Sequence, residues 1–220
     1  MTPRTFTGLS PERVRSNLDR VREEIEAAAG RAGRSGADVE VVAAVKYVPL
    51  EELGALVDGG VGVAGENRAQ DLAAKAQARP ELEWDFIGHL QSRKVKAVLP
   101  HARLIHSVAS DSALAQLERH APAQTEVLVE VNLSGEDSKS GIAPQALAEF
   151  VERCPVRVSG LMTMPPLAPR AEESRPYFAR LRELAAEHGL GRLSMGTTQD
   201  FAVAVEEGAT LVRIGTRLYE

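Results

Sequence analysis

The stretch Val39-Glu-Val-Val-Ala-Ala-Val-Lys46-Tyr-Val-Pro49 decides the fold that we expect for this chain. It is an almost unbroken apolar run that ends in a proline, which is typical of a buried parallel strand turning into a helix. Lys46 stands at the end of that strand, where the loops of parallel folds converge and where an amine can attack a carbonyl to form a Schiff base. The alternative is a surface lysine that merely follows a strand. Only five of the 26 basic residues are lysines, which slightly favours a dedicated role.

Strand-like and helix-like segments alternate along the rest of the chain. We predict strands at 39–46, 61–65, 84–88, 104–107, 125–132, 156–162, 192–195 and 211–214, and helices at 50–57, 68–78, 89–98, 111–119, around 177–185 and at 199–207. About eight strands alternating with helices indicate an α/β fold, a (β/α)8 barrel of the TIM type. An open doubly wound sheet is the alternative. The chain has no single Gly-rich dinucleotide turn, which favours the barrel.

An additional helix precedes the first strand. Ser10 is a favoured N-cap, Pro11 suits the first turn, and Gly30 ends an apolar stripe of helical spacing. We expect this helix, residues 10–30, to pack on the barrel exterior. No linker or low-complexity segment divides the chain, so residues 1–220 are predicted to form a single domain.

Composition excludes several classes of partner. The 220 residues are 44% hydrophobic and carry a net charge of -5, which leaves no basic field for nucleic acid. No apolar run approaches membrane-spanning length and the N-terminus lacks a signal-peptide core, so we expect a cytoplasmic protein without a membrane partner. Cys154 is expected to be a buried structural thiol. The histidines have no metal-ligand spacing, so no metal site is predicted, and His89 is expected to be structural.

Two strand ends near the C-terminus combine glycine with hydroxyl side chains, in Ser194-Met195-Gly196-Thr197-Thr198 and in Arg213-Ile214-Gly215-Thr216. Glycine lets a backbone approach an anion, and a helix beginning at Thr198 would direct free N–H groups to the same place. Phosphate sites in barrels commonly follow the seventh and eighth strands. The alternative is that Thr197 or Thr198 caps the next helix, with Asp200 completing a capping box.

Two further polar residues are placed at strand ends. Arg213 lies inside the last strand, where an uncompensated charge is costly, so it either pairs with a core carboxylate or points at a ligand. Asn67 either faces the barrel mouth or serves as a helix N-cap.

Short motifs in order along nearly the whole chain resemble the pyridoxal-phosphate homeostasis proteins, single-domain relatives of the alanine racemase barrel. These motifs are Val45-Lys46, Gly65-Glu-Asn67, Phe86-Ile-Gly-His-Leu-Gln-Ser92, Ile105-His-Ser-Val108, Val131-Asn132, Ser138-Lys-Ser-Gly-Ile142, Gly160-Leu-Met162, Leu193-Ser-Met-Gly196 and Val212-Arg-Ile-Gly-Thr216. The resemblance implies that Lys46 holds pyridoxal 5'-phosphate as an internal aldimine, that Arg213 faces the pyridine nitrogen and that Asn67 lines the ring. It also implies a phosphate site formed by Ser194, Thr198, Gly215 and Thr216, with Met195 among the cofactor-binding residues.

The sequence departs from the family pattern at two places. Tyr47-Val48 stands where the family usually has a small polar residue and a basic or polar one, and Thr197-Thr198 replaces the usual Met-Ser but keeps a hydroxyl. Because neighbouring side chains on a strand point to opposite faces, Tyr47 is expected to point away from Lys46.

The resemblance implies a cofactor carrier or regulator in intracellular vitamin B6 homeostasis. Such a protein would have no substantial turnover and no catalytic residue, and apo-enzymes would be its recipients. The alternative is a single-domain amino-acid racemase or another Schiff-base enzyme. A lysine aldolase is disfavoured, because a pyridine nitrogen explains Arg213 better.

Overall fold

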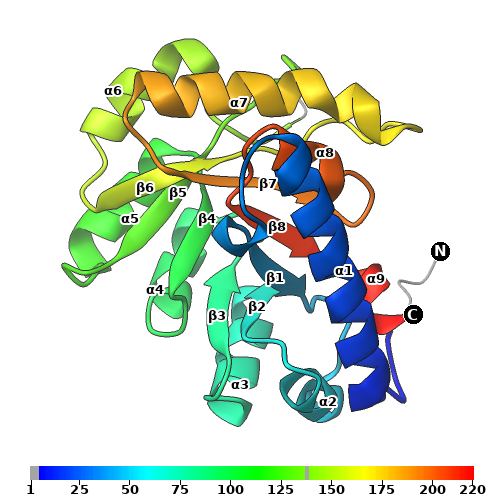
Figure 1. Cartoon of the computed structure of the whole chain (residues 1–220). Coiled ribbons are helices and arrows are strands. Elements are labelled where there is room, and N and C mark those ends of the chain that lie inside the picture. The colour runs from blue at the N-terminus through cyan, green and yellow to red at the C-terminus, as the bar shows by residue number, and fades with distance from the viewer. Residues whose placement is uncertain (1–4, 137–138) are drawn as a thin grey trace.

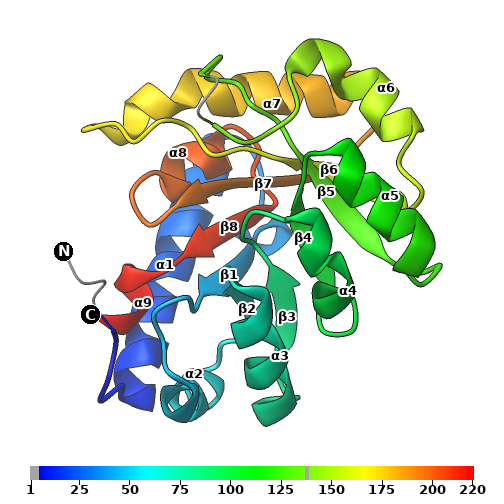
Figure 2. The same ribbon diagram turned by 180° about the vertical axis from the view of Figure 1, so that it is seen from behind.

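The computed structural model describes residues 5–136 and 139–220, so Ser138 of the loop motif lies outside the described residues. Within them, eight parallel strands follow one another around a closed barrel, and β1 pairs with both β2 and β8 (Figure 1). Helices lie between successive strands and surround the barrel (Figure 2). The predicted (β/α)8 architecture is confirmed.

The strands are β1 (Glu40–Ala44), β2 (Val63–Glu66), β3 (Glu83–Phe86), β4 (Leu104–Val108), β5 (Glu126–Glu130), β6 (Arg157–Met162), β7 (Arg192–Thr197) and β8 (Leu211–Ile214). The α-helices are α1 (Pro11–Arg31), α2 (Leu53–Asp58), α3 (Ala69–Ala78), α4 (Val95–Val98), α5 (Asp111–His120), α6 (Leu147–Glu152), α7 (Arg175–Glu187), α8 (Phe201–Glu206) and α9 (Thr216–Tyr219). Short 3-10 turns are η1 (Gly36–Asp38), η2 (Leu50–Glu52), η3 (Ser92–Lys94), η4 (Pro144–Ala146) and η5 (Ala171–Ser174).

Alternation along the strands separates two apolar layers. The barrel interior holds a small aliphatic cluster of Val42, Val63, Leu104, Leu128, Met162 and Leu211. The intervening residues, such as Ala43 and Val212, belong to the larger core between the strands and the helices.

The predicted N-terminal helix is present as α1. The Ser10 hydroxyl accepts a hydrogen bond from the Arg13 N–H at 3.3 Å, and Val14, Val21 and Ile25 are buried. α1 lies outside the barrel alongside α8 and α9, as both views show (Figures 1 and 2). None of the helices in the described ranges is long and apolar enough to cross a membrane.

Several predicted boundaries are wrong, and two of them affect the site. β1 ends at Ala44, so Lys46 belongs to a turn rather than to the strand. α8 begins at Phe201 rather than at Thr198, because residues 198–200 form a turn. The helical segment after His89 is shorter than predicted, and α6 has no counterpart in the prediction. α6 has a single buried pair, Leu147 and Phe150, which is too short for a periodic signal.

Candidate functional site

A cavity of about 590 Å³ lies at the carboxyl ends of the strands. This is the end where active sites of such barrels are built, because the loops after all the strands meet there. The residues that were predicted for a site and that line this cavity are Lys46, Asn67, Thr198, Arg213, Gly215 and Thr216. Residues from the carboxyl end of β8 and from the loops after β1, β2, β7 and β8 are therefore brought together around one space.

Lys46 is half-buried in the turn that follows β1. Its Nζ lies 5.0 Å from the centroid of the Tyr47 ring, and both side chains line the cavity. The expectation that Tyr47 points away from Lys46 is wrong. The alternation rule applies to extended strand, and β1 has already ended at Ala44.

Asn67 follows β2 and is held by a close approach of the next loop. A Cβ atom on Gly88 would lie 2.0 Å from the Asn67 carbonyl oxygen, so this approach requires glycine. The Glu66 carboxylate accepts hydrogen bonds from the N–H groups of Asn67 at 2.6 Å and of Arg68 at 3.0 Å. Arg68, rather than Asn67, occupies the N-cap position of α3.

Arg213 is 6% exposed, and its guanidinium donates to neutral groups. Nη1 donates to the carbonyl oxygen of Ser194 at 2.9 Å and to its hydroxyl, and Nη2 donates to the Thr163 carbonyl oxygen at 3.1 Å and to Met164 Sδ. Burial lowers the pKa of Arg213 to about 10, and the more distant charges of Asp200 and Glu130 oppose that shift. The side chain therefore remains a cation at neutral pH, and it forms part of the cavity wall.

A column of hydrogen bonds runs from Arg213 through the barrel interior. The Ser194 hydroxyl lies 2.9 Å from His106 Nδ1, and His106 Nε2 lies 3.1 Å from Asp85 Oδ2. At the amino ends of the strands, Arg103 donates to Asp85 through Nε at 3.0 Å and Nη2 at 2.9 Å. Because the Asp85 carboxylate can only accept, the imidazole proton is assigned to Nε2, so Nδ1 accepts from the Ser194 hydroxyl, which in turn accepts from Arg213.

The charge states in this column follow from burial and its neighbours. Burial lowers the pKa of His106, which is therefore a neutral imidazole. Burial alone would raise the pKa of Asp85, but the hydrogen bonds from His106 and Arg103 more than offset it and leave that pKa lowered. The column thus joins a cation at each end to a buried carboxylate.

The loops after β7 and β8 are joined by one hydrogen bond. The Thr198 Oγ1 accepts from the Gly215 N–H at 3.0 Å. Asp200, rather than either threonine, occupies the N-cap position of α8, and its Oδ1 accepts from the Thr197 N–H at 2.7 Å. The prediction that Thr198 starts or caps a helix is wrong, and its hydroxyl instead faces the cavity beside Thr216.

Ser194 and Met195 are absent from the cavity lining, as far as the described residues define it. Ser194 is buried beneath Arg213, with its hydroxyl held by Arg213 and His106. Met195 is fully buried in the core between strands and helices. Alternation along β7 accounts for both placements, because Ser194 points inward and its neighbour must then point outward.

Several polar residues of the lining were missed or misjudged from the sequence, among them Glu130 and His89. Glu130 at the end of β5 is buried, and its Oε1 accepts from the Ser140 hydroxyl at 2.5 Å. Burial raises the pKa of Glu130, although the hydrogen bond from Ser140 works against this shift. His89, which we expected to be structural, is exposed at the same mouth. The signal that could have indicated them is their position, because Glu130 is the last residue of β5 and His89 lies in the loop after β3.

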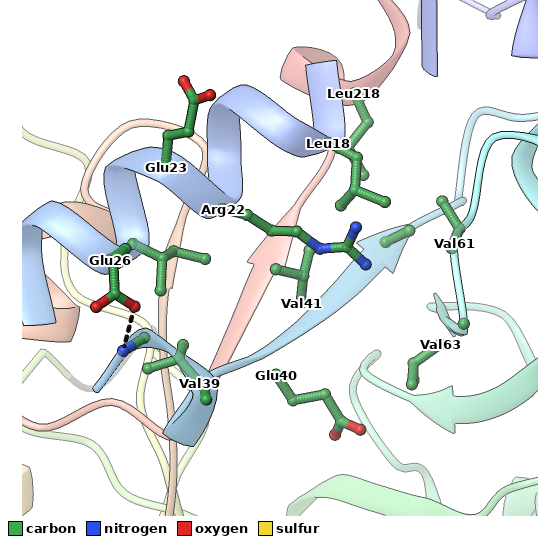
Figure 3. Close-up of a pocket in the computed structure, with 15 residues that line it drawn as sticks. Leu18, Arg22, Glu23, Glu26, Val39, Glu40, Val41, Val61, Val63 and Leu218 are labelled. Carbon is green, nitrogen blue, oxygen red and sulfur yellow. Dashed lines mark hydrogen bonds between the residues drawn. The ribbon is translucent and has the colours of Figure 1, made fainter. Parts of the chain in front are cut away.

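A hollow of about 560 Å³ lies at the opposite end of the barrel, between α1 and the first residues of β1 and β2 (Figure 3). Its walls are largely aliphatic, with Val39, Val41 and Val63 among them. The Glu26 carboxylate in it accepts from the Gly36 N–H at 2.8 Å, as the dashed line shows (Figure 3). None of the predicted site residues lines this hollow, so we place the functional site at the carboxyl end.

Comparison with known proteins connects this geometry to a family. Residues 16–220 match the family described as alanine racemase, N-terminal domain. The chain is 42% identical to the pyridoxal phosphate homeostasis protein of Aquifex aeolicus, over 92% of this chain and 95% of that protein. It is 39% identical to the protein of the same name from Pseudomonas aeruginosa, over 94% of each.

Solved structures agree with the sequence matches. PipY of Synechococcus elongatus, solved with PLP bound, superposes with a TM-score of 0.79 at 29% identity, over 94% of this chain and 100% of that one. Alanine racemase from Corynebacterium glutamicum shares the fold, with a TM-score of 0.71 at 16% identity over 96% of this chain and 61% of that one. The chain therefore belongs to the alanine racemase N-terminal domain family, together with the pyridoxal phosphate homeostasis proteins that it matches over nearly their full length.

Proposed function

We propose that this chain binds pyridoxal 5'-phosphate at the cavity after β1, β2, β7 and β8 and takes part in intracellular vitamin B6 homeostasis. Apo-enzymes of the cytoplasm are its proposed recipients. The observation that carries the proposal is the convergence of an amine, a guanidinium, an amide and two hydroxyls around one cavity. The homeostasis proteins that the chain resembles and the PLP-bound PipY structure support the choice of ligand.

The donor set fits this cofactor group by group. The aldehyde suits an amine, the pyridine nitrogen suits a cationic donor, and the phosphate dianion suits hydroxyl and N–H donors. A space of about 590 Å³ lies in the range of roughly 300–1,000 Å³ that small-molecule sites occupy. When bound, the cofactor supplies an aldehyde that a lysine amine can capture reversibly, with loss of one water.

The proposed residue roles follow the positions in the cavity. Lys46 supplies the amine, Arg213 faces the pyridine nitrogen and Asn67 lines the ring. Thr198 and Thr216 donate hydroxyl hydrogens to the phosphate beside Gly215. Ser194, whose hydroxyl is already held by its neighbours, is now proposed to hold Arg213 in place rather than to contact the phosphate.

A racemase remains the second candidate, and Glu130 is the observation in its favour. A buried carboxyl group with a raised pKa in the same cavity could move a proton. Racemisation needs one group to remove a proton on one face and another to deliver it on the other face. We favour the carrier, because Glu130 is already engaged by Ser140 and the chain's relatives are named for homeostasis.

The direct test is a spectrum followed by trapping. Protein mixed with pyridoxal phosphate should absorb in the visible, and borohydride should fix the label on the peptide that contains Lys46. A Lys46→Ala variant should lose the band, and a Lys96→Ala variant on α4 is the matched control that should keep it. Labelling spread over Lys94, Lys96 and Lys139 would overturn the assignment of Lys46.

A further inference from the structure

The backbone around Lys46 is tied to three distant parts of the chain. The carbonyl oxygens of Ala44, Val45 and Tyr47 each accept a hydrogen bond from outside β1 and its turn. The last of these comes from the Phe6 N–H, which donates to the Tyr47 carbonyl oxygen at 2.9 Å. The other two come from the side chains of Tyr219 and Lys75.

Tyr219 in α9 donates its hydroxyl to the carbonyl oxygen of Ala44 at 3.1 Å. Burial raises the pKa of Tyr219, and the nearby charge of Glu66 raises it further, so the hydroxyl keeps its proton and can only donate to this carbonyl. The ring is held separately, against Phe6 at a centroid distance of 5.0 Å. The hydroxyl and the ring of Tyr219 therefore make different contacts and can be tested separately.

Lys75 in α3 is the second side chain. It is 6% exposed, and its ammonium donates to the Val45 carbonyl oxygen at 2.7 Å and to the Glu66 carboxylate at 2.6 Å. The same carboxylate accepts the N–H group of Asn67. A buried ion pair between Lys75 and Glu66 thus connects the turn that carries Lys46 to Asn67, which follows β2 and lines the cavity.

We propose that Tyr219 and Lys75 are positioning residues for Lys46. By fixing the two carbonyl groups that precede Lys46, they hold its Cα in place before any ligand arrives. The inference rests on the proposed function, since it concerns how readily the Lys46 amine bonds to an aldehyde carbon with loss of one water. Conformational entropy that the turn has already lost in the free protein is not lost again on binding, which favours bond formation.

This role predicts a selective effect on ligands. A ligand that bonds to Lys46 gains from a fixed turn, whereas a ligand that only fills the cavity does not. Pyridoxal phosphate has the aldehyde, and pyridoxine phosphate carries an alcohol in its place and cannot bond to the amine. A residue that merely stabilises the fold would weaken both ligands alike.

The test uses Tyr219→Phe in the full chain, which removes the hydroxyl and keeps the ring. Pyridoxal phosphate should bind about two- to tenfold more weakly, the range that the net free energy of one hydrogen bond gives, and pyridoxine phosphate should bind as it does to wild type. Tyr177→Phe on α7 makes the same chemical change away from the cavity and should alter neither. Lys75→Met should weaken the binding of pyridoxal phosphate by a larger factor and, because its partner Glu66 also holds the Asn67 N–H, should weaken that of pyridoxine phosphate to a smaller extent.

A second measurement does not need the covalent bond. In protein without ligand, hydrogen–deuterium exchange of the peptide over residues 44–50 should be about two- to tenfold faster in Tyr219→Phe than in wild type or Tyr177→Phe. Equal weakening of both ligands, no weakening of either, or unchanged exchange of this peptide would overturn the positioning role. If wild type gives no visible band, the proposed function fails on its own, and the exchange comparison still decides whether Tyr219 holds the turn.

Discussion

Replacing Thr198 and Thr216 together by valine should abolish most of the affinity for pyridoxal phosphate. Both side chains line the cavity, and valine keeps their shape while removing the hydroxyl. Since the Thr198 Oγ1 already accepts from the Gly215 N–H at 3.0 Å, its own hydrogen is free to point toward a ligand. The variant therefore removes two donors from the proposed phosphate site without opening a hole in it.

The magnitude follows from the charge of the acceptor. A hydrogen bond to a charged group contributes about 1.5–3 kcal/mol, so the loss of two should cost about 3–6 kcal/mol. At 1.4 kcal/mol per factor of ten, the dissociation constant should rise by about 10² to 10⁴. A Lys46→Ala protein, by contrast, should retain the ligand noncovalently, because a Schiff base exchanges with free amines and cannot by itself hold the cargo.

Titration of both ligands distinguishes the phosphate contacts from the rest. Wild type should prefer pyridoxal phosphate to unphosphorylated pyridoxal, and the double valine variant should lose that preference. Thr198→Ser with Thr216→Ser keeps both hydroxyls and is the matched control. If pyridoxal binds wild type as tightly as its phosphate does, or if the valine variant is unaffected, the two threonines are only loop residues and the phosphate site has been misplaced.

Three further predictions concern activity and stability. Formation of D-alanine from L-alanine should be no faster than with free cofactor, because Glu130, the candidate second acid/base group, is engaged by Ser140 and one positioned acid/base group is worth about 10²–10⁴ in rate. Turnover like that of a dedicated racemase would refute the carrier. Lys75→Met should lower the free energy of unfolding in urea by about 3–5 kcal/mol, because it leaves the fully buried Glu66 carboxylate without its cation, and adding Glu66→Gln should recover most of that loss. A loss below about 1 kcal/mol for the single variant would contradict the pairing. Burial raises the pKa of Glu130, so the folded protein holds that proton to higher pH than the unfolded chain does. The free energy of unfolding therefore falls as the pH rises from about 4.3, the pKa of a glutamate in an unfolded chain, through the higher pKa of Glu130 in the folded protein. Glu130→Gln should therefore gain stability over wild type across that window in urea titrations at stepped pH, and a pH-independent difference would show that Glu130 does not titrate as described.

The fold was predictable because its signals are local. Each strand is a short apolar run next to a turn residue, and the helices of two or more turns carry their own periodicity, as α1 does around Val14 and Val21. The placement of Met195 was also within reach, since an inward Ser194 requires an outward neighbour. Treating the strand as ending at Lys46 was the error that misplaced Tyr47.

The polar interior could not be predicted, because its partners are far apart in sequence. His106 and Ser194 are 88 residues apart, and no local pattern links them. A lysine in an alanine-rich helix is usually exposed, yet Lys75 is buried because it reaches Val45, 30 residues earlier. Burial of this kind depends on tertiary contacts that only the closed barrel supplies.

The column from Arg213 to Arg103 has a consequence for protein engineering. Its members Ser194, His106 and Asp85 come from three strands, and each is hydrogen-bonded to the next. A graft that carried the loops of this mouth together with Arg213 of β8, but not the rest of the column, would leave its guanidinium above a foreign interior, where a buried guanidinium without acceptors is strongly disfavoured. A successful transplant must carry side chains through the whole depth of the barrel, so in this protein the unit of exchange is a cross-section of the sheet rather than a set of surface loops.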